Sequence, residues 1–233
     1  TDREIADILL KNYKRKGVGF LLGAKVTAVG DGAVTCEYNG KTESLPADCV
    51  LCAVGRRPNT SGIGLESIGV LTERGAVVTD ERGRTNVPGV YAAGDALRGP
   101  ATVVEGIAHT AYREGEVAVN DMLGKKDAVN YMSIPSVIYT NPEVASVGET
   151  DESVRAKGIE AETRSLTLRY SGRYGPENEG GDGIVKIITD KAHHRVLGVH
   201  MIGNYASEII YGAAMMVERE MRVEDVRRFV FPH

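Results

Sequence analysis

The segment from Thr85 to Asp95 constrains the fold of this chain more than any other. Its residues 86–89, Asn-Val-Pro-Gly, are typical of a turn, and the apolar run 90–93 is too short for a helix. We therefore expect a buried strand that ends in Gly94-Asp95. A carboxylate just beyond the carboxyl end of a strand lies where open α/β sheets bind ligands, and a glycine lets a ligand approach closely. Asp95 is thus placed to accept hydrogen bonds from a polyol, although an isolated Gly-Asp is more often a turn with a helix N-cap.

The residues before this segment predict half of a dinucleotide-binding fold. Apolar residues at helical spacing predict a helix over 2–16, and Asn39-Gly40 is a strong hairpin signal. The remaining patterns predict short strands, at 17–22, 25–29, 33–38, 41–45 and, fully buried, 48–54. A Gly-x-Gly-x-x-Gly loop after a strand, which would hold a pyrophosphate, does not occur in the sequence. We therefore expect the second half of a Rossmann-like domain.

The residues after Asp95 predict a long helix and then a different kind of domain. The helix spans about 102–123, and the polar residues 125–131 read as a linker. Beyond the linker we expect an antiparallel sheet with helices on it, with strands at 136–139, 143–147, 161–168, 183–189 and 195–203, and helices at 152–157, 205–219 and 223–229. The predicted fold class is therefore α/β, followed by an α+β domain.

The composition is that of an ordinary globular protein. The chain has 233 residues, of which 42% are apolar and 26% charged, which is enough for one large domain or two smaller ones. A net charge of -4 with scattered Lys and Arg argues against a nucleic-acid partner. No apolar run approaches membrane-spanning length, and the first residues lack a signal pattern, so we expect a cytoplasmic protein with no membrane partner.

The cysteines are better explained by packing than by chemistry. Cys49 and Cys52 have redox-motif spacing, but residues three apart on the strand predicted at 48–54 point to opposite faces and cannot form a disulfide. We expect both to be buried as small hydrophobic residues, and Cys36 to lie on another strand. Residues 193–194, two adjacent histidines, are expected in a solvated turn, which we favour over a metal site.

Several motifs together resemble one family of enzymes. The pattern Thr-x3-Gly-Val-Tyr-Ala-Ala-Gly-Asp, which ends at Asp95, resembles the second flavin-binding motif of the pyridine nucleotide-disulfide oxidoreductases. Residues 52–59 (Cys-Ala-Val-Gly-Arg-Arg-Pro-Asn), 134–148 and 231–233 (Phe-Pro-His) resemble the dihydrolipoamide dehydrogenase branch of that family. These segments occur in the family's order and span nearly the whole chain.

The resemblance implies a set of site residues. They are, for FAD, Gly94, Asp95, Gly106, Ile107, Ala108 and His109, for NAD, Val26 and Gly55, and, for catalysis, His233. In the family the aspartate matching Asp95 binds the ribityl chain of FAD, and the segment matching 106–109 approaches the flavin through its backbone. A short insertion precedes that segment here and leaves its register open. The histidine matching His233 moves a proton to and from the redox dithiol of the partner subunit, work that suits an imidazole.

The resemblance also implies an activity and an assembly. Dihydrolipoamide would reduce a redox disulfide, electrons would pass through FAD, and hydride would leave to NAD. The protein would be a homodimer that serves a lipoyl-bearing protein of a 2-oxoacid dehydrogenase or glycine cleavage complex. The predicted domains are the second half of an NAD-binding domain, an FAD-binding segment and a dimerisation domain, at 1–60, 61–127 and 128–233.

Three expectations remain open at this point. The family's Cys-x4-Cys pair and N-terminal FAD half do not occur in the sequence, so we expect a fragment that is inactive alone. Another disulfide reductase, such as mercuric or glutathione reductase, would share the Gly94-Asp95 and His233 motifs, and a fragment could also act only as a dimerisation module. The choice between NAD and NADP depends on a residue that this sequence does not contain.

Overall fold

The chain has a mixed α/β architecture that divides into two compact units. The structure is a computed structural model that describes residues 1–98, 107–178, 181 and 183–231. One unit is Leu10–Arg56, and the other joins Thr1–Leu9 to the residues from Arg57 onward. No helix in the described ranges is long and apolar enough to cross a membrane. The predicted fold class is confirmed.

The unit Leu10–Arg56 contains a three-stranded antiparallel meander. Its strands follow one another in the chain and pair with their sequence neighbours, as β1 (Lys25–Gly30), β2 (Ala33–Tyr38) and β3 (Lys41–Pro46). Asn39 and Gly40 both have positive φ, at 49° and 74°, as a tight hairpin of this kind requires. The predicted hairpin is confirmed, and Cys36 is buried on β2.

Two strands predicted in this unit are absent from the described residues. Residues 17–22 and 48–54 are extended or turned without a ladder, and Leu51 and Val54 are each 89% exposed. The interpretation of Cys49 and Cys52 as buried core residues is wrong, because both are exposed. An apolar run becomes a buried strand only beside another strand, and β1 to β3 pair only among themselves.

The region between Arg57 and Met122 combines a small sheet with one long helix. The sheet has the order β4-β5-β6, with β4 (Thr72–Glu73) antiparallel and β6 (Leu97–Arg98) parallel to the central β5 (Ala76–Val78). A short 3-10 helix, η1 (Glu66–Ile68), precedes the sheet. The strand predicted at 90–93 is wrong, since only Tyr91 makes an isolated bridge, to Arg84. The helix predicted at 102–123 is α2, described from Ala108 to Met122.

The last hundred residues form a five-stranded antiparallel sheet with helices around it, as predicted. Its order is β7-β8-β11-β10-β9, for β7 (Ser136–Ile138), β8 (Val144–Gly148), β9 (Ala161–Thr167), β10 (Ile184–Asp190) and β11 (Val196–Ile202). The helices are α3 (Asp151–Ala156), α4 (Tyr174–Glu177), α5 (Ala206–Glu218) and α6 (Val223–Val226), with 3-10 turns η3 (Tyr131–Ser133) and η4 (Leu168–Tyr170). The turn predicted at 193–194 is also found, between β10 and β11.

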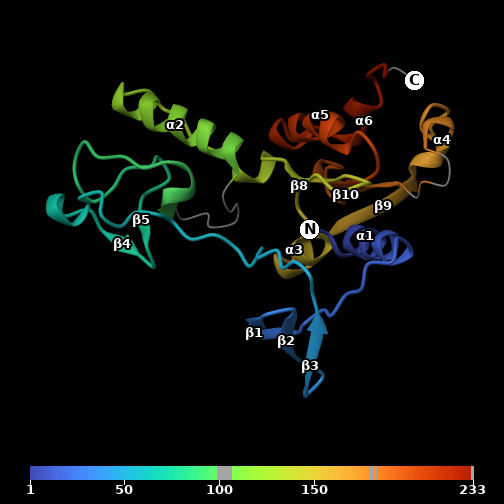
Figure 1. Cartoon of the computed structure of the whole chain (residues 1–233). Coiled ribbons are helices and arrows are strands. Elements are labelled where there is room, and N and C mark those ends of the chain that lie inside the picture. Colours follow the sequence, from blue (N-terminus) through green and yellow to red (C-terminus); the bar gives the residue numbers. More distant parts are fainter. Residues whose placement is uncertain (99–106, 179–180, 182, 232–233) are drawn as a thin grey trace. The chain divides into compact units, whose positions relative to one another are not determined.

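Helices cover both faces of this sheet, which differ in chemistry (Figure 1). The face under α5 is apolar, with Val147, Val199 and Met201 against Ile210. The first residues of α1 (Arg3–Arg15) lie on the other face, where Ile5 contacts sheet residues in a smaller apolar cluster. A row of directly paired polar residues crosses this second face from one edge strand to the other, through Ser136, Ser146, His200, Lys186 and Ser165.

Lys186 lies in the centre of that row and is almost completely buried. Its ammonium group contacts three carboxylates, Asp2 at 2.9 Å, Asp151 at 2.5 Å and Glu4 at 3.3 Å. Burial alone would lower the pKa of Lys186, but the hydrogen bonds to Asp151 and Asp2 raise it above its ordinary value. The lysine is therefore charged, and it joins the start of α1 to the sheet.

Candidate functional site

The Gly94-Asp95 motif forms one tight turn that rests on α2. Residues Gly94–Ala96 make a single 3-10 turn, closed by the Leu97 N–H donating to the carbonyl oxygen of Gly94. Gly94 has φ +74°, and a Cβ at this position would lie 2.9 Å from the Cβ of Ala111. Only glycine fits both the backbone conformation and this close approach to the helix. The side chain of Asp95, by contrast, is exposed.

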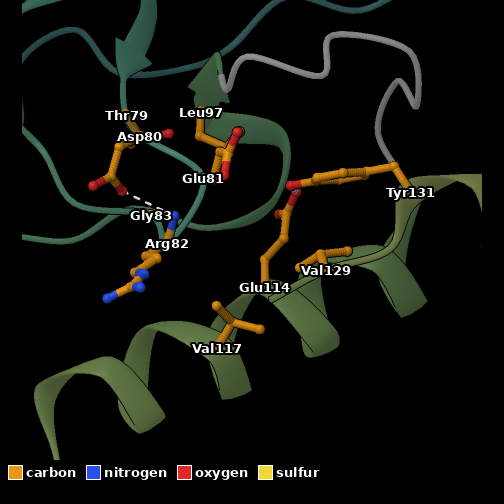
Figure 2. A pocket seen from close by; sticks show the side chains of 10 residues that line it. All are labelled: Thr79, Asp80, Glu81, Arg82, Gly83, Leu97, Glu114, Val117, Val129 and Tyr131. Atoms are coloured by element: carbon orange, nitrogen blue, oxygen red, sulfur yellow. Dashed lines mark hydrogen bonds between the residues drawn. The ribbon is translucent and has the colours of Figure 1, made fainter. Parts of the chain in front are cut away.

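A buried glutamate of α2 holds this turn in place. The Gly94 N–H donates to Oε2 of Glu114 at 2.7 Å, and the Tyr131 hydroxyl donates to Oε1 at 2.9 Å. Glu114 is only 8% exposed, and Figure 2 shows its carboxylate pointing toward the Tyr131 ring. Burial, and then the hydrogen bond to Glu114, raise the pKa of Tyr131 well above its usual range. The tyrosine is therefore a stable hydrogen-bond donor to the carboxylate at neutral pH.

The two residues line a small pocket beside the turn. Its wall includes residues 79–83, Leu97, Val117 and Val129, together with Glu114 and Tyr131 (Figure 2). The enclosed space holds about one water molecule. This pocket is too small for a cofactor, so any nucleotide would bind outside it.

The beginning of α2 lies near the motif, since Ala111 in its first turn lies against Gly94. Ile107 precedes the helix in an extended conformation, with no side-chain cap, and Ala108 is exposed. His109 donates from Nε2 to the carbonyl oxygen of Pro135 at 2.8 Å, so its ring is turned toward the segment before β7. Uncapped N–H groups at a helix start favour a negatively charged or electron-rich partner.

The other end of α2 is held by a second buried acid. Asp121 accepts hydrogen bonds from Arg84 at 2.5 Å, from the Tyr91 hydroxyl at 2.8 Å and from Arg82 at 3.0 Å. The bonds from Arg84 and Tyr91 hold the pKa of the Asp121 carboxyl far below its ordinary value. Tyr91 belongs to the motif itself, so both ends of the segment 84–95 are fixed to one helix.

The predicted NAD residues lie in the other unit. Val26 is on β1 and is 57% exposed, and Gly55 has φ +112° and no heavy atom within 4 Å of the place that a Cβ would take. Gly55 therefore presents an exposed backbone, whereas Val26 is paired with Cys36 of β2. Gly106 and His233 fall outside the described residues, and the predicted roles of all the site residues stay predictions.

Sequence reasoning missed Glu114, Asp121 and Tyr131. A usable signal was present, because residues 110, 114, 117, 118 and 121 recur at helical spacing and form the buried face of α2. Two acids on an otherwise buried face predict hydrogen-bond partners in the core. Their partners could not be named, since Gly94 and Tyr131 are far from Glu114 in the sequence.

Solved structures place this fold among the disulfide reductases. LpdA from Mycobacterium tuberculosis matches all of this chain over 50% of its own, with a TM-score of 0.86 and 26% identity. The HOCl-induced flavoprotein disulfide reductase RclA from Escherichia coli matches all of this chain over 53% of its own, with a TM-score of 0.86 and 25% identity.

Two models of protein families match different parts of the chain. The model of the pyridine nucleotide-disulphide oxidoreductases matches residues 1–115, and that of their dimerisation domain matches residues 134–233. The chain belongs to this family, as the sequence motifs predicted. Enzymes of the family use FAD, with NAD as the nicotinamide partner in its dihydrolipoyl dehydrogenases.

Individual curated proteins that are similar in sequence to this chain include dihydrolipoyl dehydrogenases. Over the whole chain it is similar to dihydrolipoyl dehydrogenase of Geobacillus stearothermophilus (36% identity) and to the mitochondrial dihydrolipoyl dehydrogenase of Dictyostelium discoideum (38%). It is also similar, at 37% identity, to leghemoglobin reductase of Glycine max. The chain spans 49%, 48% and 45% of these proteins, about half the length of the curated relatives it matches.

Proposed function

We propose that this chain supplies part of the flavin and NAD sites of a homodimeric, FAD-dependent dihydrolipoyl dehydrogenase. The observation that carries the proposal is the Gly94-Asp95 turn, which rests on α2 and presents an exposed carboxylate. Similarity to dihydrolipoyl dehydrogenases over the whole chain supports the choice of this activity within the family. The match to a dimerisation domain supports the homodimer.

The described residues fit a bound FAD. Asp95 would accept hydrogen bonds from the ribityl hydroxyls, and Gly94 leaves room beside them because it has no side chain. The backbone of residues 106–109 would approach the flavin, where the helix dipole of α2 favours the negative charge of the reduced ring. Bound FAD would carry electrons between a dithiol and NAD.

Three further residues have proposed roles of their own. Val26 and Gly55 would contact NAD through backbone groups, and Gly55 is exposed. His233 would hold and return the proton of a substrate or enzyme thiol through its imidazole. The natural reductant would then be a dihydrolipoyl group on a protein of a 2-oxoacid dehydrogenase or glycine cleavage complex.

The test is flavin binding and turnover by the complete gene product. We expect a yellow dimer that couples dihydrolipoamide oxidation to NAD reduction. Asp95→Ala should weaken FAD binding about ten- to hundredfold, because a hydrogen bond to a charged group contributes about 1.5–3 kcal/mol. Asp31→Ala, which changes an exposed acid in the turn between β1 and β2, is the matched control and should bind FAD normally.

Assays on the same protein preparation distinguish this function from the two alternatives, another disulfide reductase and a dimerisation module. Rapid NADPH-dependent reduction of glutathione disulfide or Hg(II), with no lipoamide activity, would show a different reductase of the family. A colourless dimer that stays colourless when FAD is added would leave only a dimerisation module and would end the proposal.

A further inference from the structure

We propose that Glu114 is the positioning residue of the flavin-binding turn, and that it connects this turn to the dimerisation domain through Tyr131. The inference rests on the proposed function, since it assumes that Asp95 holds FAD. It concerns a residue that touches neither the flavin nor the substrate in our assignment. Its role would be to fix the backbone from which the Asp95 side chain extends.

The first step is the hydrogen bonding of the turn. Gly94–Ala96 is a single turn, and a backbone bond between Leu97 and Gly94 closes its far end. At its near end the Gly94 N–H is bound by Glu114 at 2.7 Å. A lone turn has little stability of its own, so the direction of the Asp95 carboxylate depends on this external contact.

The second step is the burial of the carboxylate. Glu114 is 8% exposed and makes its bonds to two donors, one at each oxygen. Removal of the side chain would leave both a backbone N–H and a tyrosine hydroxyl without an acceptor in a buried place, which is costly. Glutamine keeps most of these contacts, because its oxygen still accepts from the Gly94 N–H. Its amide group donates to the tyrosine oxygen, so the bond to Tyr131 is kept with its direction reversed.

The third step follows the bonds toward the dimerisation domain. Tyr131 opens the 3-10 turn η3, whose Ser133 and preceding Asn130 both donate to Glu218 at the end of α5. Helix α5 covers the apolar face of the five-stranded sheet. Two sets of hydrogen bonds, joined by the backbone of η3, thus link the flavin-binding turn to the exposed end of α5 in the domain matched as the dimerisation domain.

The experiment measures FAD binding by the complete gene product and four variants. We expect Glu114→Leu to raise the Kd for FAD about tenfold or more and to alter the visible absorption of the bound flavin. Glu114→Gln should bind FAD nearly as the unchanged protein does. Tyr131→Phe, which removes one of the two bonds, should fall between them. Glu116→Leu, at an exposed position two residues along α2, is the matched control and should have no effect.

The outcomes separate this inference from the proposed function. If a folded Glu114→Leu variant binds FAD with unchanged affinity while Asp95→Ala does not, the positioning role is wrong and the flavin site stands. Equal weakening by Gln and Leu would also overturn it, because glutamine preserves the bond from the Gly94 N–H on which the positioning of the turn rests. Should the Leu variant fail to fold, unchanged FAD affinity in Tyr131→Phe decides against the inference. If the unchanged protein binds no FAD, both proposals fail.

Discussion

At the scale of single residues, the candidate site depends on one glycine. Gly94 combines a left-handed backbone with a contact to Ala111 that leaves no room for a Cβ. The motif therefore specifies glycine through local geometry in addition to any contact with a ligand. Asp95 next to it is unconstrained by packing, since its side chain is exposed.

This geometry makes a direct stability prediction. Gly94→Ala should lower the free energy of unfolding by at least about 1–2 kcal/mol, the cost of a left-handed conformation for an L-residue, with a further loss from the contact to Ala111. Urea denaturation would measure it. Gly115→Ala is the control, because a Cβ there meets open space in the interior of α2 and should stabilise the protein by about 0.5–1 kcal/mol. Equal stability of the two variants would contradict the conformational argument.

At the scale of elements, α2 organises the segment that carries the motif. Glu114 accepts a hydrogen bond from Gly94, which follows Tyr91 in the chain. Asp121, two helical turns further along α2, accepts hydrogen bonds from Tyr91 and from Arg84. Because the strand predicted at 90–93 does not form, these side-chain bonds take the place of a ladder in holding the segment.

The Asp121 cluster predicts a dependence on pH. Its carboxyl pKa is lowered in the folded protein, so the ionised group stabilises the fold above its unfolded pKa of about 4. This contribution is lost as the pH falls through the lowered folded value. Asp121→Asn should therefore reduce the melting temperature by several degrees at pH 7 and make it less sensitive to acid below about pH 4. Calorimetry across pH would show this, and parallel acid profiles for the two proteins would refute it.

Elements also show what the sequence could predict. The strands between residues 136 and 202 were predicted to within about two residues, because their apolar patterns are bounded by polar turns and each strand finds a neighbour in the sheet. The runs 17–22, 48–54 and 90–93 have similar apolar patterns but no ladder in the described residues. An apolar pattern indicates that a segment can form a strand, but a strand forms only where a neighbouring strand is available to pair with it. Asp95 could be singled out from its motif, and helical spacing could mark Glu114 as a buried acid. Its partners Gly94 and Tyr131 could not be named, because they are distant from it in the sequence.

At the scale of the whole molecule, buried charge joins distant parts of the chain. Lys186 in the sheet contacts Asp2 and Glu4 at the start of α1, and Asp151 at the start of α3. The ammonium and Asp2 are both almost fully buried, so neither charge can be hydrated if its partner is removed.

Removal of the lysine should be strongly destabilising. Lys186→Met leaves the buried Asp2 carboxylate without a cation, and we expect a loss of about 3–5 kcal/mol in the free energy of unfolding. Addition of Asp2→Asn to that variant should recover part of the loss, because it removes one of the unpaired charges. Lys191→Met, an exposed lysine beyond the same strand, should change stability by less than about 0.5 kcal/mol. Strictly additive effects of the first two changes would argue against the pairing.

The polar row across the five-stranded sheet also limits how that sheet can assemble. Side chains alternate between the two faces, so a slip of one residue in β10 or β11 would turn Lys186 or His200 toward the apolar side that α5 covers. Such a slip would place a charged or imidazole side chain among aliphatic groups. It would also place valine side chains beside the carboxylates at the start of α1. A misaligned ladder is therefore less stable than the native one, and the polar row helps to fix the register of the strands.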